Sequence, residues 1–463
     1  MENITYQNIS IEGVSYNKLV SLQITHNVGD HAYASIELEV EKDSGLDFIK
    51  RADESTDVLI KTTAKGQHET LFAGCVLGVG MQEMAEYSVL NLKLVSTSYR
   101  LDIQKKQKTY QNTTATYGDV MKKAAGDAAT VKVDVSDKVT GNLVMQYEET
   151  DWKFIERMAS QLSASVFTDI DSVTPQIHIG VPKRSGLLSF DTVEMKSYTQ
   201  PAGYNLLANQ FSLGGNKTAT TINSVQGENY KFIGEKMSVN GADYVIGSVN
   251  CSMELGVLKC TYGLGNSDNC KSVAGSNSQL AGRMFLGEVK AVKGDQVQVH
   301  FSDIDDSYDA GGDKWFPYST AYSSSDGSGF YCMPEEGDKV RVFIPSKNEK
   351  DAFVASSVNG NPQSNTRDKS WKAPGGKEIL LADDGIYIIC EGEKIFINLT
   401  KENGIQIHSE KPISVTSDSN IIMQAGEEIN ITADTCINIG VGNSSIYIDK
   451  SQIEMGAEGV YIN

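Results

Sequence analysis

The chain has 463 residues, with 60 acidic against 41 basic side chains and a formal charge of −19. Since single hydrophobic cores stop growing at about 250–300 residues, we expect several domains. The negative charge repels nucleic-acid phosphate and anionic lipid, so binding to either is not expected. The N-terminal MENITYQNIS has neither a basic start nor an apolar stretch, and no run of 18 apolar residues occurs. We therefore expect a soluble chain without a secretory signal.

The cysteines stand at positions 75, 251, 260, 270, 332, 390 and 436, an odd number with no CxxC spacing. Scattered cysteines of this kind are typical of reduced structural thiols in a chain made in a reducing cytoplasm. We favour that interpretation over disulfides or a metal cluster.

The first two hundred residues are predicted to be largely β, with two helices. Apolar and polar side chains alternate strictly in residues 35–40 and 90–94, which indicates half-buried antiparallel strands. Between them, the apolar run ETLFAGCVLGVG contains Gly74, Gly78 and Gly80, as at the bulges of a strongly bent sheet. A barrel or half-barrel is expected.

Two helix starts interrupt this region. Thr116 to Asp119 resembles a capping box ahead of VMKKAAG, and Thr150 with Asp151 precedes WKFIERMASQL. The second helix is expected to pack on the sheet through an apolar face, with a charged face opposite. The apolar residues are Trp152, Ile155, Ala159 and Leu162, and the charged ones are Lys153, Glu156 and Arg157.

Residues 145–167, MQYEETDWKFIERMASQLSASVF, resemble a segment of the VgrG and phage gp27/gp5-type proteins, the trimeric central spikes of contractile injection systems. FAGCVLGVG and the following YSVLNLKLVSTSYRLDIQKKQKTYQ are also similar to the first barrel of that family. The resemblance implies a hub of two tube-like barrels with inserted helices over residues 1–275. Three copies of such a hub would form a pseudo-sixfold ring that matches a hexameric tail tube.

Two features of this region could suggest chemistry. Glu148, Glu149 and Asp151 form a carboxylate cluster, but we favour a helix-start role for Asp151 and solvated or subunit-contact roles for the glutamates. The LGGNKT stretch at 213–218 lacks the spacing of a phosphate-binding loop and is interpreted as a turn.

Residues 276–362 are predicted to form a five-stranded barrel of the oligonucleotide/oligosaccharide-binding type. GRMFLGEVKAVKGDQVQVHF supplies a hairpin, and WFPYSTAY, GDKVRVFIP and AFVASSVNGNP supply further strands. These segments also resemble the corresponding spike domain of the same family. The loop at 303–309 is acidic, so we expect a solvated loop in preference to a nucleic-acid or Ca²⁺ site.

The C-terminal part repeats an apolar-x-apolar doublet with a step of eight residues. The doublets at the centre of this repeat are Ile405/Ile407, Ile413/Val415, Ile421/Met423, Ile429/Ile431 and Ile437/Ile439. Further doublets begin at residues 386, 395, 446, 453 and 460 with looser spacing. Alternation sends both apolar side chains of a doublet to one face, so each octad is expected to be one short strand and a bend.

Eight residues are too few to enclose a core, so three strands are expected to form the sides of a triangular prism. We expect three chains, with each strand hydrogen-bonded to neighbouring chains and the listed doublets in the trimer core. A one-chain solenoid is the rival interpretation. The prediction is a polar linker at 363–376 and an intertwined β-helix at 377–463, similar to the needle of gp5-type spikes.

The resemblance implies a non-enzymatic homotrimer at the tip of a phage tail, tailocin or type VI apparatus, made in the bacterial cytoplasm and delivered to a target envelope. Expected partners are tail-tube or tube-initiator proteins, baseplate proteins and a separate tip cap or effector. No catalytic residue, cofactor or metal is expected; the linker is too short for an enzyme, and no histidine follows His408. A receptor-binding tail fibre and a cell-wall hydrolase are the alternatives.

Overall fold

The computed structural model describes residues 2–184, 187–190, 194–200, 220–308, 314–361 and 364–461. The fold is mainly β, as predicted, and the chain divides into two compact units, Met1–Gly360 and Asn361–Asn463. The LGGNKT stretch lies outside the described residues. No helix among the described residues is long and apolar enough to span a membrane.

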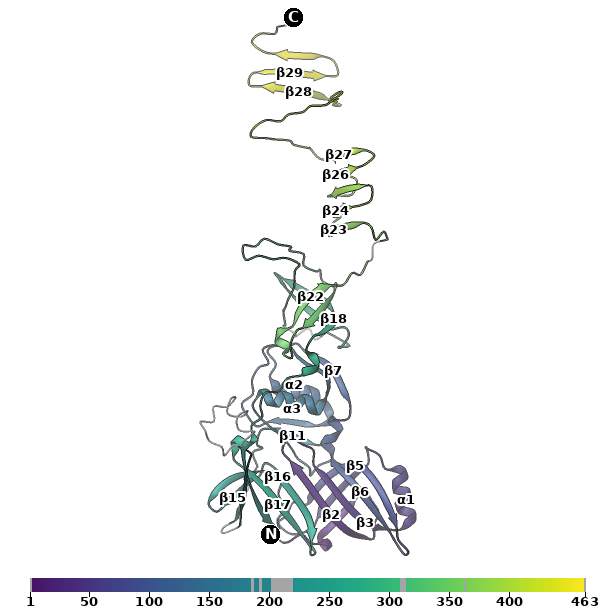
Figure 1. Ribbon diagram of the computed structural model, residues 1–463, viewed down its shortest axis with the longest axis vertical. Helices are drawn as coiled ribbons and strands as arrows, with labels where there is room; N and C mark the ends of the chain where they lie inside the picture. Colours follow the sequence, from purple (N-terminus) through teal and green to yellow (C-terminus); the bar gives the residue numbers. More distant parts are fainter. Residues whose placement is uncertain are drawn as a thin grey trace. The chain divides into compact units, whose positions relative to one another are not determined.

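A large sheet dominates the first unit (Figure 1). Its strands follow the order β1-β4-β5-β6-β3-β2-β16-β17-β14-β13, and β12 joins through β15 to β16. The bounds are β1 Ile9–Glu12, β2 Lys18–Asn27, β3 Tyr33–Val40, β4 Asp57–Thr62, β5 Thr70–Glu83, β6 Ser88–Ser96, β12 Leu187–Phe190, β13 Lys196–Thr199, β14 Thr221–Gly227, β15 Lys236–Val239, β16 Ala242–Glu254 and β17 Val257–Gly265. Helix α1 (Lys42–Arg51) follows β3.

The alternating segments pair as expected. Ile36 of β3 lies opposite Leu92 of β6, and both side chains are buried. The β5–β6 register shifts between Val76 and Gly78, which confirms a bulge in the glycine-rich strand. The two strand sets expected to form separate barrels are hydrogen-bonded to each other through β2 and β16, so among the described residues they make one continuous sheet.

The middle of the first unit contains two packed helices and short strands. Its elements are β7 Lys105–Tyr110, α2 Tyr117–Ala125, β8 Thr130–Val133, β9 Val144–Thr150, α3 Asp151–Gln161, β10 Val166–Thr168 and β11 Gln176–Ile179. Both predicted caps are confirmed: the Thr116 hydroxyl accepts from the Asp119 amide at 3.1 Å, and the Thr150 hydroxyl from the Lys153 amide at 3.2 Å. Helix α3 buries Trp152 and Ile155 as predicted.

A five-stranded barrel follows, in the order β20-β19-β18-β21-β22. A bridge between Tyr318 and Val354 brings its two edges together. The strands are β18 Arg283–Lys293, β19 Gln296–His300, β20 Phe316–Pro317, β21 Lys339–Ile344 and β22 Phe353–Ser357. Short 3₁₀ turns in the first unit are η1 Tyr6–Asn8, η2 Thr97–Leu101, η3 Gly126–Ala128, η5 Ser267–Cys270, η6 Ser278–Leu280 and η7 Glu349–Asp351.

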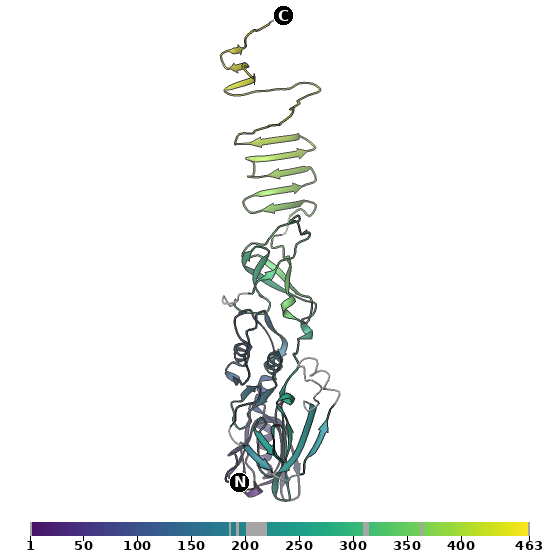
Figure 2. The same cartoon turned by 90° about the vertical axis from the view of Figure 1, so that its left-hand side faces the viewer.

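The second unit contains two antiparallel meanders. Figure 2 shows the strands of the first meander stacked as successive rungs. They are β23 Lys369–Ala373, β24 Lys377–Leu381, β25 Gly385–Ile389, β26 Ile395–Thr400 and β27 Gly404–Ser409. The second meander comprises β28 Cys436–Val441, β29 Ser444–Asp449 and β30 Ile453–Gly456.

This pairing differs from the expectation that each C-terminal strand bonds to neighbouring chains. In both meanders, consecutive strands of one chain bond to each other. The physical reason is local: turns at Gly392, Gly404 and Gly442, all with positive φ, reverse the chain between strands. Residues 410–435, all described, contain no strand.

The cysteine prediction was wrong at one pair. Cys251 and Cys260 are directly opposite each other in β16 and β17, with their Cα atoms 4.1 Å apart, and they form a disulfide. The β16–β17 hairpin turns at Leu255 and Gly256. Cys251 lies four residues before Leu255 and Cys260 lies four residues after Gly256, so the hairpin places the two cysteines opposite each other. Both turn residues have positive φ, at 50° and 88°.

Candidate functional site

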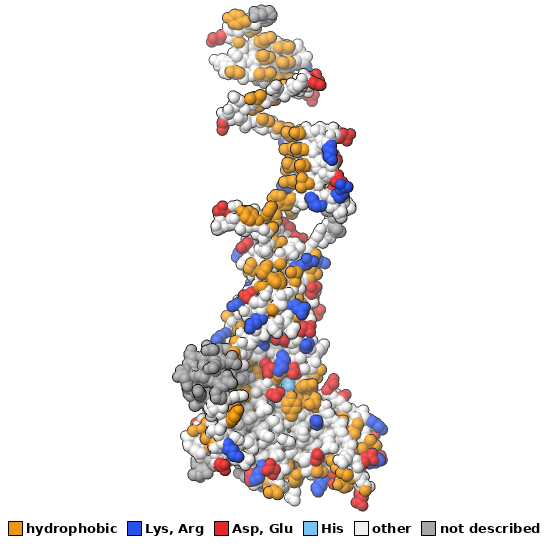
Figure 3. Space-filling view, in the orientation of Figure 1, with side chains coloured by type: hydrophobic (Ala, Val, Ile, Leu, Met, Phe, Trp, Pro, Cys, Tyr) orange, Lys and Arg blue, Asp and Glu red, His pale blue; other side chains and the backbone are white. Residues whose placement is uncertain are grey.

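An apolar ladder covers one face of β24 to β27. Cross-strand pairing aligns its side chains in two columns across the four strands. The columns are Leu381–Ile386–Leu399–Ile405 and Ile379–Ile388–Ile397–Ile407, and Trp371 of β23 extends the second. All eight aliphatic side chains are exposed, from 37% for Ile397 to 72% for Ile405. Figure 3 shows this stripe of apolar side chains.

The second meander repeats the arrangement on three strands. Here the columns are Ile437–Ile448–Ile453 and Ile439–Ile446–Met455. The predicted core residues Ile405, Ile407, Ile437 and Ile439 therefore each belong to an ordered apolar face. Their burial in a trimer stays a prediction.

The other six predicted core residues lie in the strand-free segment. They are Ile413, Val415, Ile421, Met423, Ile429 and Ile431, with exposures from 51% to 70%. Among the described residues, none between 411 and 435 makes a backbone–backbone hydrogen bond. The eight-residue spacing of the doublets continues through this segment, although its residues pair with no strand of the same chain.

The second unit has no core of its own. Across its described residues no hydrophobic side chain is buried, whereas the first unit buries three clusters of them. Monomeric soluble proteins rarely expose contiguous apolar patches of more than a few hundred Å². The ladder is therefore the surface in this molecule that most needs a partner.

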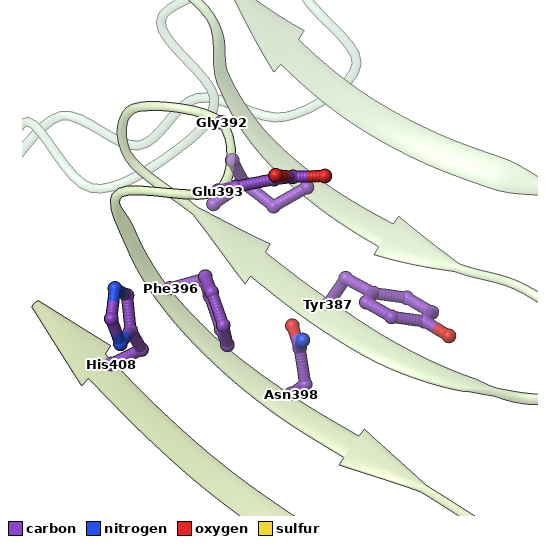
Figure 4. Close-up of a pocket in the computed structure, with 7 residues that line it drawn as sticks. Tyr387, Gly392, Glu393, Phe396, Asn398 and His408 are labelled. Carbon is purple, nitrogen blue, oxygen red and sulfur yellow. The ribbon is translucent and has the colours of Figure 1, made fainter.

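The opposite face of the first meander carries a shallow hollow of about 610 Å³. Figure 4 shows Phe396 and His408 with their rings face to face, 5.2 Å between centroids, and Tyr387 beside Asn398. The side-chain amide oxygen Oδ1 of Asn398 is buried without a partner, and the Tyr387 hydroxyl donates to Asp384 at 2.7 Å. Glu393 is the single carboxylic acid among the seven lining residues, so these residues lack the carboxylate pair of a typical glycosidase.

A buried arginine joins the middle region to the barrel. Arg157 of α3 donates to Glu149 at 2.8 Å and to Glu349 of η7 at 2.8 Å, and its side chain is only 7% exposed. It also donates to the Met145 carbonyl at 2.7 Å. Although burial opposes it, the two carboxylates raise the pKa of Arg157. The prediction that Arg157 lies on a charged face away from the packed side of this helix is therefore wrong, because its side chain is buried.

The acidic loop of the barrel makes a second connection. Asp305 accepts from the Thr109 amide at 2.9 Å and also from the Thr109 hydroxyl. Burial raises the pKa of Asp305, against the effect of these hydrogen bonds. The loop is therefore not simply solvated, because Asp305 ties the barrel to β7. Leu143 and Met145 strengthen this junction by packing in the barrel core.

The three clustered carboxylates have separate structural partners. Asp151 is buried at the helix start, where it accepts from Gln146 at 2.9 Å and pairs with Lys106. Glu148 accepts from Gln107 at 2.7 Å, while Glu149 pairs with Arg157 and its side chain is only 15% exposed. A subunit contact of either glutamate stays a prediction. Within the described residues, no group of three or more His, Cys, Asp or Glu side chains is placed to hold a metal.

Two parts of this site were not predicted from the sequence. Ile379 and Leu381 begin the ladder, and their apolar-x-apolar pattern was a visible signal that the doublets start earlier than residue 386. The Arg157 cluster had no comparable signal, because Glu149 and Glu349 are two hundred residues apart in the chain.

Comparisons with known proteins identify solved structures with a similar fold. No protein-family model and no curated protein matches the sequence. The solved structure of the Escherichia coli c3393 protein aligns with a TM-score of 0.55 and 14% identity, over 76% of this chain and 99% of its own. It is described as a type VI secretion component that is structurally similar to the T4 phage tail proteins gp27 and gp5. The chain has a VgrG/gp27-type hub fold.

A chain of the Francisella PdpA–VgrG complex is also similar to this hub fold. It aligns with a TM-score of 0.53 and 8% identity, over 87% of this chain and 79% of its own. At these identities the likeness establishes the hub fold alone. The function has to be argued from the surfaces described above.

Proposed function

We propose that this chain is the homotrimeric central hub and spike at the tip of a contractile tail or injection apparatus. It joins the baseplate and tube to a needle that pierces the target envelope when the sheath contracts. The observation that carries the proposal is the second unit, in which the described residues expose an ordered apolar ladder and bury no hydrophobic side chain.

Copies of the same chain are the partners that best fit the ladder. Each column is a row of aliphatic side chains at a constant spacing, so identical faces can mesh with one another. Burying an isoleucine or leucine stabilises by about 1.5–3 kcal/mol relative to leaving it in water. Because the eight aliphatic side chains of the ladder are already about half covered, the summed gain per chain is about 6–12 kcal/mol, comparable to the usual stability of a domain.

Three copies fit the width of the ladder better than two. Each strand contributes two inward positions, about 7 Å apart along the strand. Two such narrow sheets face to face would leave both margins of the core open to water, whereas three close a triangular prism around the apolar columns. We therefore assign residues 377–463 to the needle and 363–376 to its linker, in which β23 already pairs with the first needle strand.

The hub fold supports our assignment of the remaining domains. Residues 1–275 form the hub that meets tail-tube, tube-initiator and baseplate proteins, and residues 276–362 form the barrel between hub and needle. The contacts of Arg157 and Asp305 support a mechanical role, because they fasten the barrel to α3 and to β7. A separate protein is proposed to cap the needle or serve as an effector.

The proposed role is structural, not enzymatic. The test combines location and activity in the particle that carries the chain. Antibody against an epitope-tagged chain should label the tail tip, and particles lacking residues 370–463 should contract without killing target cells. Purified full-length protein should release no soluble fragments from peptidoglycan. Label along the sheath or at distal fibres would overturn the assignment, and peptidoglycan release would show a hydrolase.

A further inference from the structure

Strand pairing gathers aromatic rings and an amide on the face of the first meander opposite the ladder. Tyr387 of β25 lies directly across from Asn398 of β26, and Phe396 of β26 lies directly across from His408 of β27. Side chains alternate between the two faces of a strand, so this register places all four on one face and the aliphatic columns on the other. Together they line most of the hollow of about 610 Å³.

The rings offer electron-rich surfaces to this hollow. Figure 4 shows the Phe396 ring between His408, which stacks on one of its sides, and the Asn398 amide on the other. The Tyr387 hydroxyl donates to Asp384 at 2.7 Å, and a hydrogen bond to a carboxylate makes the phenol ring richer in electrons. Aromatic faces carry negative charge density and attract cations. The rings therefore favour a cationic ligand.

Two further side chains supply oxygen acceptors. Gly392, with a positive φ of 55°, lies in the turn between β25 and β26, and the Glu393 side chain that follows lines the hollow. The seven lining residues contain this one carboxylate and no lysine or arginine. Oδ1 of Asn398 is buried and has no partner among the described residues, which is costly for an acceptor. Because the χ2 torsion of asparagine is broad, the amide can turn this oxygen toward a donor in the hollow.

We propose that this hollow binds a primary alkylammonium group, as on a lysine side chain or a free diamine. The rings attract its charge, the Glu393 carboxylate neutralises it, and one of its N–H groups donates to Asn398. A quaternary ammonium would contact the rings but leave Asn398 unpaired, since it has no N–H donor. The lining residues all belong to one chain, so the site does not depend on the proposed trimer.

Saturation-transfer NMR on the full-length protein at about pH 8, where an alkylammonium is charged, tests the ligand class. We expect n-butylammonium to bind at least about tenfold more tightly than n-butanol, which has nearly the same shape without the charge. It should also bind more tightly than tetramethylammonium, which cannot donate a hydrogen bond. Equal binding of n-butanol or tetramethylammonium, or binding of N-acetylglucosamine alone, would overturn the proposal.

Substitutions in one turn and one strand locate the site. Glu393→Gln and Phe396→Leu should each weaken n-butylammonium binding by at least about fivefold, because the first removes the charge and the second the aromatic face. Glu391→Gln is the matched control, since Glu391 pairs with Lys394 at 3.3 Å in the same turn and does not line the hollow. Its affinity should stay unchanged. Unchanged affinity in the first two variants, or an equal loss in the control, would overturn the site.

A variant that gains affinity guards against losses caused by misfolding. Asn398→Asp adds a second carboxylate of the same shape and should tighten n-butylammonium binding by at least about threefold. N-acetyl-lysine amide and diaminobutane then distinguish the two sources of the ammonium group, and the tighter binder identifies the source. Failure of both to bind, or weaker n-butylammonium binding by a folded Asn398→Asp protein, would overturn the proposal.

Discussion

Arg157 shows how a single residue can connect parts of this chain that are far apart in sequence. Its guanidinium contacts Glu149, Glu349 and the Met145 carbonyl, so one side chain fastens α3 to β9 and to the barrel. A planar group with several donors suits such a junction, because it can serve several acceptors at once. Force passing between barrel and hub would cross this contact.

Replacing Arg157 by Met should destabilise the first unit by about 3–5 kcal/mol, because two poorly exposed carboxylates lose their counter-charge. Lys153→Met is the matched control on the same helix. Its ion pair with Glu156 is more open, with the lysine side chain 58% exposed, so a loss below about 1 kcal/mol is expected. Urea unfolding followed by tryptophan fluorescence measures both; similar losses would reject the anchoring role.

His26 makes folding sensitive to acid. Burial, followed by the charge of Arg184, lowers the pKa of His26 to about 3, while its ordinary value is 6.5. Because the unfolded chain binds the proton more readily, this contribution to stability is present above pH 6.5 and is lost as the pH falls toward 3. The expected loss between pH 6.5 and pH 4 is about 3 kcal/mol.

Thermal unfolding between pH 6.5 and pH 4 measures this loss of stability. The His26→Gln variant should show a weaker dependence of stability on pH. The pKa of His178 is shifted in the opposite direction. Although burial lowers it, Asp169 and Asp134 raise the pKa of His178 above its ordinary value. Its contribution is present below the unfolded pKa and is lost as the pH rises through the folded one. An unchanged slope in the His26 variant would assign the acid sensitivity to other groups.

At the scale of elements, the apolar doublets of the second unit occur with and without strands. In the meanders one face holds aliphatic columns, and at residues 411–435 the apolar-x-apolar pattern continues without strands. The register places Ile429 and Ile431 on the same side of an extended chain and Asn430 on the other. This difference provides a direct test of which side faces the axis.

Changing both Ile429 and Ile431 to Asp should prevent trimerisation of the needle, because six carboxylates from three chains would meet in a dry core. Asn430→Asp, between them, should leave assembly nearly unchanged. Size-exclusion chromatography and SDS resistance measure the outcome. Equal tolerance at all three positions would reject the assigned register.

Elements that are determined by a few neighbouring residues could be predicted from the sequence, whereas pairings between distant residues could not. The caps at Thr116 and Thr150 were predictable because a helix start is decided within four residues. The meander strands were predictable as strands but not as in-chain pairs, since an apolar-x-apolar doublet is the same for either partner. The Cys251–Cys260 disulfide was missed because Leu255–Gly256 is not one of the usual hairpin-turn sequences. The trimer-core role of the ten listed residues stays a prediction.

At the scale of the whole molecule, the two units differ in how they obtain a core. The first unit buries its apolar side chains within one chain, with separate clusters for the large sheet, the helices and the barrel. The second unit exposes its apolar columns throughout its described residues. We therefore expect the first unit to fold alone and the second to fold only with copies of itself.

The molar mass of the full-length protein, measured by light scattering on a size-exclusion column, tests the trimer most directly. We expect a molar mass of three times the 50.3 kDa of one chain. A protein ending near residue 370 should give a smaller assembly or one that dissociates on dilution, because it lacks the ladder. A folded full-length protein that elutes at 50.3 kDa would contradict the account.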